Sequence, residues 1–438
     1  MPSTRRRFLE QWVLGLVGAS SARAIASEAD QEPPAGMPPA FGTGPAVGPE
    51  ITPATIAEAE KLAQIQYTPA ERAQAAGNWR VSLAPLSERR TGPRKVALDP
   101  GLAPASRWDP VLPGAAAPVS RGRFVPSVGP AAPLPARDED IAFARLPALS
   151  GWIRKRALSC ERLAGIYLER LERFQPQLNC TITLTRDLAL AQARQADREI
   201  AGGKYRGPLH GIPWGAKDLV DTAGIPTTYG AEPFRDRVPS KDAIVVERLH
   251  QAGAVLVAKL SLGALALNDI WFGGQTNNPW LLEEGASGSS AGPGAATAAG
   301  CVTFALASET GGSIIAPAMR CGVVGLRPTY GRVPRTGAMT LCWSLDKLGP
   351  IARGVEDTLL VLQALSGPDP GDVASVPSVL DFDAGGAVQG LRVGYVRKWL
   401  DEPPATDVDR AALESVRRAG MVPVAVELPE RRSREIAG

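Results

Sequence analysis

The sequence predicts an α/β fold with a central, largely buried β-sheet. Two observations carry this prediction. Helical and strand patterns alternate along the chain from about residue 138 onward, an order that is typical of α/β domains. Apolar residues make up 44% of the 438 residues and charged residues 21%, so the chain has enough material for at least one large core.

The first 26 residues are expected to form an export signal. Consecutive arginines in RRRFL (residues 5–9) precede a short apolar run at 12–19, which is too brief to span a bilayer. This order resembles a twin-arginine signal, and small residues at 22–26 offer cleavage sites. We therefore expect no stable membrane span and export of the folded protein to the periplasm. An accidental basic tail is the alternative.

Residues 27–137 are predicted to be a proline-rich linker that carries a short helical arm. Proline, glycine and alanine dominate residues 32–49, and proline-rich sequence returns between 98 and 135, a composition that cannot support a core. In the intervening stretch, Thr52 and Thr68 are each followed by proline and helix-forming residues. This pattern is typical of a helix N-cap with proline at the first helical position, so we expect two short helices.

The main domain is predicted to run from 138 to 438. Apolar side chains recur with helical spacing in residues 158–174 and again in AIVVERLHQAG, which ends at Gly253. The following AVLVAKL (254–260) is predicted to be a buried strand because of its valine and leucine content. Helix, turn and strand is thus the recurring unit.

Composition argues against several kinds of partner. The net charge is +3 and no run of five lysines or arginines occurs, so no nucleic acid partner is expected. The five cysteines lack C-x-x-C spacing and the chain has only two histidines, so we expect no metal site and no cofactor. The cysteines are interpreted as buried small apolar residues, with one disulfide pair left open.

The stretch EGASGSSAGPGAATAAG (284–300) is either a flexible spacer or part of a structured site. It leads through an alanine-rich helix with a stop at Gly300 into an apolar strand and a second glycine turn, ETGGSI (309–314). A spacer would not be followed so closely by core. Small residues here let the helix and neighbouring backbone approach, and Gly288 and Gly292 allow backbone dihedrals closed to other residues. The neighbouring hydroxyls of Ser287, Ser289 and Ser290 would be held on ordered backbone.

Four separated blocks resemble the amidase signature family over roughly residues 140–370. They are GPLHGIPWGAKD, GASGSSAGPGAATAAG, ETGGSI, and the pair CGVVGLRPTYGRV with SLDKLGPIARGVEDT, in the family's order. The resemblance implies a mixed β-sheet flanked by helices and hydrolysis of an amide bond. It also implies that Ser313 is the nucleophile, Ser289 a bridging serine after a cis peptide bond from Gly288, and Lys217 the base.

The implied chemistry suits these residue types. A serine hydroxyl is a poor nucleophile until a base takes its proton, and two histidines give a Ser-His-Asp arrangement few candidates. Burial would lower the pKa of Lys217, so that its neutral amine could draw a proton from Ser313 through Ser289. The resemblance places an oxyanion hole at the backbone N–H groups of Thr310, Gly311, Gly312 and Ser313.

Each residue also has a purely structural interpretation. Lys217 could be a surface lysine, although its apolar neighbours suggest burial. Ser289 could be only a turn residue, and Ser287 and Ser290 are expected to orient backbone rather than take part in chemistry. His210 is interpreted as a structural residue, and His250 as a residue on a helix face.

Two departures from the commoner family pattern bear on the substrate. Glu309 stands where the family usually has aspartate, and Ile315 stands where it usually has arginine. The second change removes a positive charge, so a small-molecule amide that is neutral or hydrophobic is favoured over an anionic one. Possible walls of its pocket are the aromatic residues Tyr229, Trp271 and Phe272.

Three functions of different classes remain open. The favoured one is an exported Ser-Ser-Lys amidase. The second is a cytoplasmic glutaminase like the A subunit of glutamyl-tRNA amidotransferase. The third is a binding or inactive protein, since family members usually continue beyond the point where this chain ends and we expect a truncated last part. Substrate identity, preference for amide or ester, and oligomeric state are left open.

Overall fold

The computed structural model describes residues 48–82, 121–127, 133–403 and 405–428. The chain divides into two units, one of residues 103–385 and one that joins 1–102 with 386–438. The expected export signal and most of the proline-rich linker lie outside the described residues. The predicted domain of 138–438 thus differs from the structural division, which places residues from 386 onward in the other unit.

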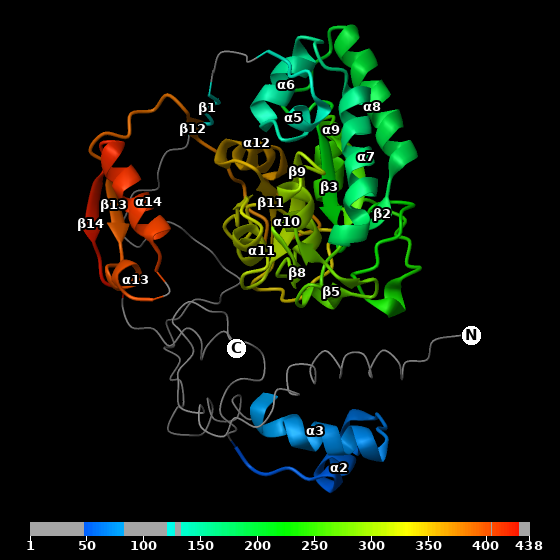
Figure 1. Ribbon diagram of the computed structural model, residues 1–438. Helices are drawn as coiled ribbons and strands as arrows, with labels where there is room; N and C mark the ends of the chain where they lie inside the picture. Colours follow the sequence, from blue (N-terminus) through cyan, green and yellow to red (C-terminus); the bar gives the residue numbers. More distant parts are fainter. Residues whose placement is uncertain (1–47, 83–120, 128–132, 404, 429–438) are drawn as a thin grey trace. The chain divides into compact units, whose positions relative to one another are not determined.

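A six-stranded mixed sheet forms the centre of unit 103–385 (Figure 1). Its strand order is β10-β11-β9-β3-β4-β2. The middle of the sheet is parallel, since β3 pairs in parallel with both β9 and β4, and the antiparallel strands β11 and β2 extend it on either side. The strands are β2 Thr181–Leu184, β3 Pro213–Lys217, β4 Val255–Leu260, β9 Phe304–Glu309, β10 Val324–Gly325 and β11 Lys347–Ala352.

Helices pack around this sheet, as the sequence predicts for an α/β fold. Helices α7 and α8 lie together, and α8 packs on β4, while α12 contacts β11 and α9 (Figure 1). Helix α10 packs on β9 and on β3. The helices are α5 Asp138–Ala142, α6 Leu146–Arg154, α7 Cys160–Leu178, α8 Arg186–Ala201, α9 Ile244–Gln251, α10 Ala291–Ala298, α11 Ile315–Arg320 and α12 Val355–Leu365.

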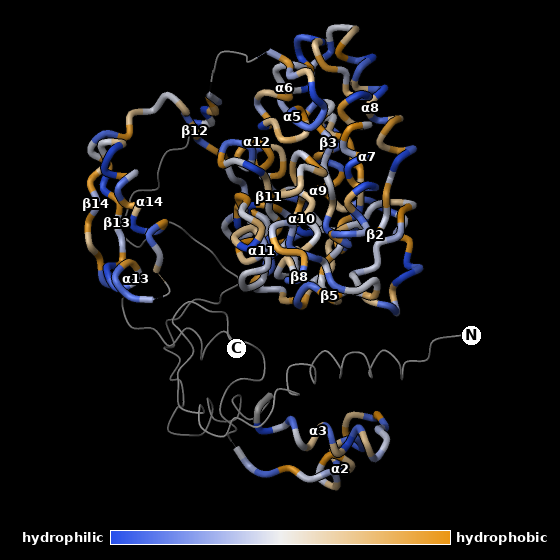
Figure 2. The backbone as a smooth tube through the Cα atoms, viewed as in Figure 1, coloured by the Kyte–Doolittle hydropathy of each residue, from blue (hydrophilic) through white to orange (hydrophobic). Residues whose placement is uncertain are grey.

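The predicted local patterns are confirmed where they were strongest. Helix α7 begins after Ser159, whose side chain accepts the Arg162 N–H as an N-cap. Helix α9 is followed by Gly253 at φ +81°, and every residue of β3 and β4 is buried. Figure 2 shows the contrast between the outer helices and the centre of this unit. Helices α7 and α8 carry hydrophilic residues among hydrophobic ones, whereas the segments around α10 are largely hydrophobic.

Short strand pairs surround the sheet. Strand β1 pairs in parallel with β12, so part of the predicted linker joins the larger unit. Strands β5 and β6 form one antiparallel pair and β7 and β8 another. These strands are β1 Phe124–Val125, β5 Ile270–Trp271, β6 Gly274–Gln275, β7 Asn277–Asn278, β8 Leu281–Gly285 and β12 Phe382–Asp383.

The second unit contains two separate groups of elements. Helices α2 (Pro53–Ala63) and α3 (Pro69–Ser82) form the predicted arm, and Thr52 caps α2. The Thr68 hydroxyl accepts the backbone N–H of the third helical residue of α3, as the N-cap pattern predicts. The other group is β13 (Arg392–Tyr395), α13 (Lys398–Asp401), α14 (Asp407–Arg418) and β14 (Val422–Ala425), in which the two strands pair in parallel.

No helix among the described residues is both long enough and apolar enough to cross a membrane.

The cysteines agree with their interpretation as small core residues. All five are free thiols, and four of them are buried while Cys342 is half-buried. Burial raises the pKa of the Cys180 thiol to about 11, so this thiol is unreactive at neutral pH. Within the described part of the chain, no group of three or more histidine, cysteine or acidic residues could hold a metal ion.

Candidate active site

Lys217 is the last residue of β3 and is completely buried. Its Nζ lies 2.8 Å from the Ser289 Oγ, 2.9 Å from the Ser290 Oγ and 2.9 Å from the Ser308 Oγ. The interpretation of Lys217 as a surface lysine is therefore wrong. The Ser290 hydroxyl also donates to the Ser308 carbonyl and accepts the Ser308 N–H, so its expected role in orienting backbone stays a prediction. Three hydroxyl groups surround one amine.

The surroundings of Lys217 favour its neutral form. Burial lowers its pKa well below the usual lysine value, against a smaller opposing influence of the Asp346 and Glu309 carboxylates. Among the described residues, no carboxylate forms an ion pair with Lys217. A neutral amine that contacts a serine hydroxyl has the geometry of a general base.

The serine-bearing turn approaches neighbouring backbone very closely. The peptide bond from Gly288 to Ser289 is cis, as the family resemblance implies. A Cβ on Gly288 would lie 1.8 Å from the Asn268 carbonyl oxygen, and one on Gly292 would lie 2.5 Å from the Ser261 nitrogen. Neither glycine has a positive φ, so the reason for glycine at both positions is the close approach of neighbouring backbone.

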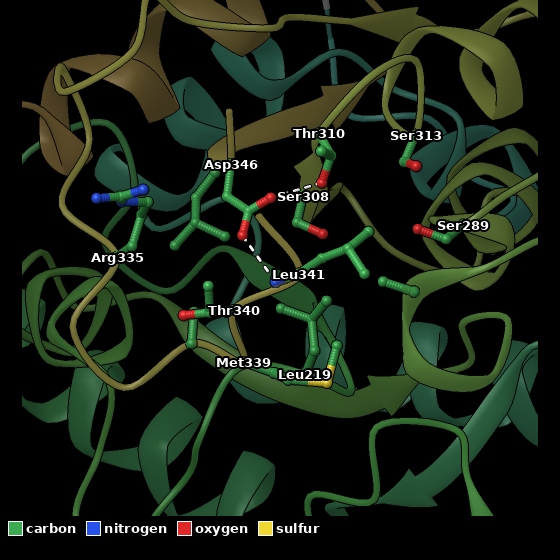
Figure 3. A pocket seen from close by; sticks show the side chains of 13 residues that line it. Leu219, Ser289, Ser308, Thr310, Ser313, Arg335, Met339, Thr340, Leu341 and Asp346 are labelled. Atoms are coloured by element: carbon green, nitrogen blue, oxygen red, sulfur yellow. Dashed lines mark hydrogen bonds between the residues drawn. The ribbon is translucent and has the colours of Figure 1, made fainter. Parts of the chain in front are cut away.

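Ser313 lies in the turn that follows β9 and lines a pocket with Ser289, Ser308 and Thr310 (Figure 3). The backbone N–H of Ser290 donates to the carbonyl of Ser313 at 3.2 Å, which joins the two serine-bearing turns. The Ser313 hydroxyl has no hydrogen-bond partner among the described residues. Catalytic hydrogen bonds commonly tighten only when substrate binds, so this geometry is compatible with a relay from Ser313 through Ser289.

The nucleophile turn, residues 310–313, presents backbone donors. None of its four N–H groups donates to another described residue. Gly312 has a φ of +136°, a conformation that favours glycine, and a Cβ on Gly311 or Gly312 would meet nothing within 4 Å. Free N–H groups beside open space are what an oxyanion hole requires.

Glu309 anchors the far side of this turn. Its carboxylate is almost completely buried and accepts the backbone N–H groups of Ile314 at 2.8 Å and Ile315 at 3.0 Å. Arg327 lies 3.1 Å from its other oxygen. The glutamate thus binds the first N–H groups of α11, while the Ile315 side chain is 45% exposed and leaves no cation at that position.

The pocket beside Ser313 is mostly apolar, and its two charged residues are already partnered. Arg335 donates to both carboxylate oxygens of Asp372 and to the Trp343 carbonyl. Both oxygens of Asp346 accept hydrogen bonds from the protein (Figure 3). The apolar lining residues are Leu219, Ala266, Ala338, Met339, Leu341 and Leu348.

The sequence analysis missed Ser308 and Asp346. Ser308 belongs to the apolar strand that leads to the ETGGSI turn, and Asp346 directly precedes β11 inside the SLDKLGP block. Both residues lie in or beside blocks already singled out. The approach of Ser308 to Lys217 depends on the pairing of β3 with β9, and that of Asp346 to Thr310 depends on the pairing of β9 with β11.

The three aromatic residues suggested as pocket walls lie apart from the pocket that contains Ser313. Tyr229 packs under the Arg237 guanidinium, 4.6 Å from the ring centre, and Phe272 packs in the same way under Arg235. Trp271 is nearly buried, and its Nε1 donates to the carbonyl of Asn179. None of the three is among the residues that line the pocket, so their role as walls of a substrate site stays a prediction.

Neither histidine contributes to this pocket. His210 is buried, and its Nδ1 accepts the backbone N–H of Arg206. His250 lies exposed on α9. The position of His250 on a helix face is confirmed, and the structural role of His210 stays a prediction. Lys217 is the buried basic group that contacts the serines.

Comparisons with known proteins agree with this geometry. A family model described as amidase matches residues 162–435. The glutamyl-tRNA(Gln) amidotransferase A subunit of Anaeromyxobacter sp. (strain K) is 41% identical over 286 residues, which are 63% of this chain and 58% of that protein.

Solved structures give the same result. The peptide amidase of Stenotrophomonas maltophilia is 35% identical with a TM-score of 0.60, over 65% of this chain and 62% of that one. A fatty acid amide hydrolase is 26% identical with a TM-score of 0.61, over 68% of this chain and 55% of that one. The chain thus spans less than two thirds of the length of these relatives.

Proposed function

Because the chain belongs to the amidase signature family, we propose that it hydrolyses the C–N bond of a carboxylic amide through an acyl-enzyme on Ser313. The observation that carries the proposal is the 2.8 Å contact between the buried Lys217 amine and the Ser289 hydroxyl, beside the pocket that Ser313 lines. A surface lysine would carry its charge and could not serve as a base at neutral pH.

In the first half of the reaction, the Ser313 Oγ attacks the amide carbonyl carbon. Its proton passes to Ser289, whose own proton passes to the neutral Lys217 amine. The carbonyl oxygen becomes an oxyanion that the N–H groups of residues 310–313 stabilise, where one such donor is worth about 3–4 kcal/mol of barrier. When the C–N bond breaks, the relay returns a proton to the leaving amine.

In the second half, water attacks the acyl-enzyme by the same route. Lys217 accepts a proton from the water through the serine relay, and the second tetrahedral intermediate collapses to a carboxylic acid and free Ser313. The proton that Lys217 accepted returns to Ser313. Lys217 thus serves as the base in both acylation and deacylation, and neither step needs a histidine.

We propose a linear, uncharged amide with an apolar acyl group as the substrate. Most of the accessible surface of the pocket is apolar, and its two charged residues already have partners within the protein. An anionic substrate would need a free cation, and Ile315 supplies none where the family usually has arginine. Apolar pockets with a few fixed polar groups favour ligands of matching polarity.

A glutaminase is the second candidate, because the 41% identical relative is an amidotransferase A subunit. Release of ammonia from glutamine by the purified chain, with loss of that release in Ser313→Ala, would favour this candidate. Turnover of neutral acyl amides without turnover of glutamine would favour the first.

We also propose export by the twin-arginine route, on the basis of RRRFL (residues 5–9) and the short apolar run that follows. The test is the N-terminus of the protein recovered from the periplasm. Cleavage within 22–26 supports export, whereas a full-length protein that stays in the cytoplasm contradicts it. Replacing Arg5 and Arg6 by lysine should retain the protein inside the cell.

The activity is tested with a fluorophosphonate probe and intact mass measurement. The parent protein should gain one probe mass and Ser313→Ala none. Ser287→Ala is the matched control. It also replaces a serine by alanine, but in the glycine-rich stretch 284–300 and at a residue that does not line the pocket. An unlabelled parent, or labelling that persists in Ser313→Ala, would contradict the proposal.

A further inference from the structure

Asp346 faces the nucleophile turn across two paired strands. Strands β9 and β11 are antiparallel with Glu309 opposite Lys347, so the residues just beyond them, Thr310 and Asp346, meet. The Asp346 Oδ1 accepts the Thr310 hydroxyl at 2.5 Å, and the Lys347 Nζ donates to the Thr310 carbonyl at 3.0 Å. The consecutive residues Asp346 and Lys347 therefore bind Thr310, the first residue of the turn, at its side chain and at its backbone.

The second oxygen of the same carboxylate holds a wall of the pocket. Asp346 Oδ2 accepts the backbone N–H groups of Leu341 and Cys342, both at 2.8 Å. The segment that precedes this contact, residues 338–341, lines the pocket opposite Ser313 (Figure 3). One carboxylate thus links the turn with the proposed oxyanion donors to the segment that would contact the acyl group.

Asp346 also acts electrostatically on the base. Burial is the main cause of the lowered pKa of Lys217, and Asp346 is the larger of the two anionic influences that oppose it. Charge-assisted hydrogen bonds are shorter and stronger than neutral ones, so the ionised carboxylate is the form that suits the three donors around it.

We propose that Asp346 is a positioning residue of the reaction, which fixes the Thr310 end of the oxyanion turn against the pocket wall at 338–341. This inference rests on the proposed function. It predicts that loss of the carboxylate slows attack by Ser313 without removing any group that touches the reacting atoms.

The test is the second-order rate of fluorophosphonate labelling of the full chain. In Asp346→Asn, the charge is lost and only one oxygen remains, so the side chain cannot accept from both Thr310 and the wall. We expect labelling to fall about ten- to a hundredfold, the range for hydrogen bonds to charged groups. Thr310→Val removes only the hydroxyl and should slow labelling about tenfold. Thr310→Ser should restore most of that loss.

The pH dependence separates positioning from a general loss of structure. Asp346→Asn removes an anion that raises the pKa of Lys217, so the pH at which labelling reaches half of its maximum should move downward. Thr310→Val keeps the carboxylate, so its half-maximal pH should stay at the parent value. Thermal unfolding of each variant shows whether it is folded.

The possible outcomes distinguish failure of this proposal from failure of the proposed function. Slower labelling in both variants, rescue by Thr310→Ser and a pH shift only in Asp346→Asn would support the proposal. Parent-like rates and pH profiles in folded variants would overturn it while leaving the proposed function intact. If Asp346→Asn does not fold, a parent-like rate in Thr310→Val is enough to overturn the proposal. An unlabelled parent would overturn both.

Discussion

Two completely buried lysines on neighbouring strands have opposite surroundings. Lys259 on β4 forms an ion pair with the buried Asp218 at 2.9 Å and contacts the Thr227 hydroxyl at 2.6 Å. Lys217 on β3 contacts three serine hydroxyls and, among the described residues, no carboxylate. Burial lowers the pKa of both, but an adjacent anion opposes this directly only at Lys259.

Register places the two lysines on opposite faces of the sheet. Lys259 pairs with Ala216, and Lys217 is the next residue along β3, so its side chain points to the other side. One face receives a lysine that is paired with the buried Asp218 carboxylate. The other face receives a lysine that has no such partner among the described residues, beside the candidate nucleophile. The difference teaches that the counter-ion, rather than burial, separates the structural lysine from the base.

Lys217→Met gives the largest expected effect on chemistry. Labelling of Ser313 should fall by about a thousandfold, because the relay loses its base. The pKa of Lys217 is lower in the folded chain than in the unfolded chain, where it has the usual value of 10.5. At a pH below 10.5, holding this amine neutral therefore costs the folded state free energy. Urea unfolding at neutral pH should therefore show equal or higher stability for the variant. Labelling at the parent rate would contradict the assignment.

Lys259→Met should act on stability instead. Removing one partner of a buried ion pair leaves Asp218 as an uncompensated buried charge, which costs about 3–5 kcal/mol. The matched control is the double variant Asp218→Asn with Lys259→Met, which should recover part of the loss in urea unfolding. A single variant as stable as the parent would show that the pair is not ionised, and the comparison between the two lysines would fail.

Glu309→Gln gives the smallest expected effect and sharpens the comparison. It removes the weaker of the two anionic influences on Lys217, so the pKa of Lys217 should fall further and half-maximal labelling should move to lower pH. Both N–H groups at the start of α11 donate to the same carboxylate oxygen, so the amide oxygen can still accept them and the rate should fall by about tenfold or less. The measurement is the labelling rate between pH 5 and 10, and an upward shift would contradict the electrostatic account.

Local patterns were enough to predict the elements that carry the site. Helical spacing predicted α7 and α9, valine and leucine content predicted β4, and glycine turns marked both ends of the β9 segment. The family resemblance then gave Lys217, Ser289 and Ser313, which the structure brings to one region.

The rest depended on contacts between distant segments. Ser308 lies beside Lys217 because β3 pairs with β9, and Asp346 lies beside Thr310 because of the register of β9 against β11. No local pattern contains either pairing. The sequence allows either special dihedrals or close backbone approach as the reason for Gly288 and Gly292, and the contacts with Asn268 and Ser261 show that close approach decides both positions.

The central claim is that Lys217 is the neutral base of a Ser313 nucleophile. The most direct measurement is the rate of fluorophosphonate labelling of Ser313 in the parent protein as a function of pH, with Lys217→Met beside it. We predict that the parent rate rises with pH through a single ionisation well below the usual lysine pKa and that the variant lacks this rise. A parent profile that rises only near the pKa of an ordinary lysine, or the same low-pH rise in Lys217→Met, would contradict the account.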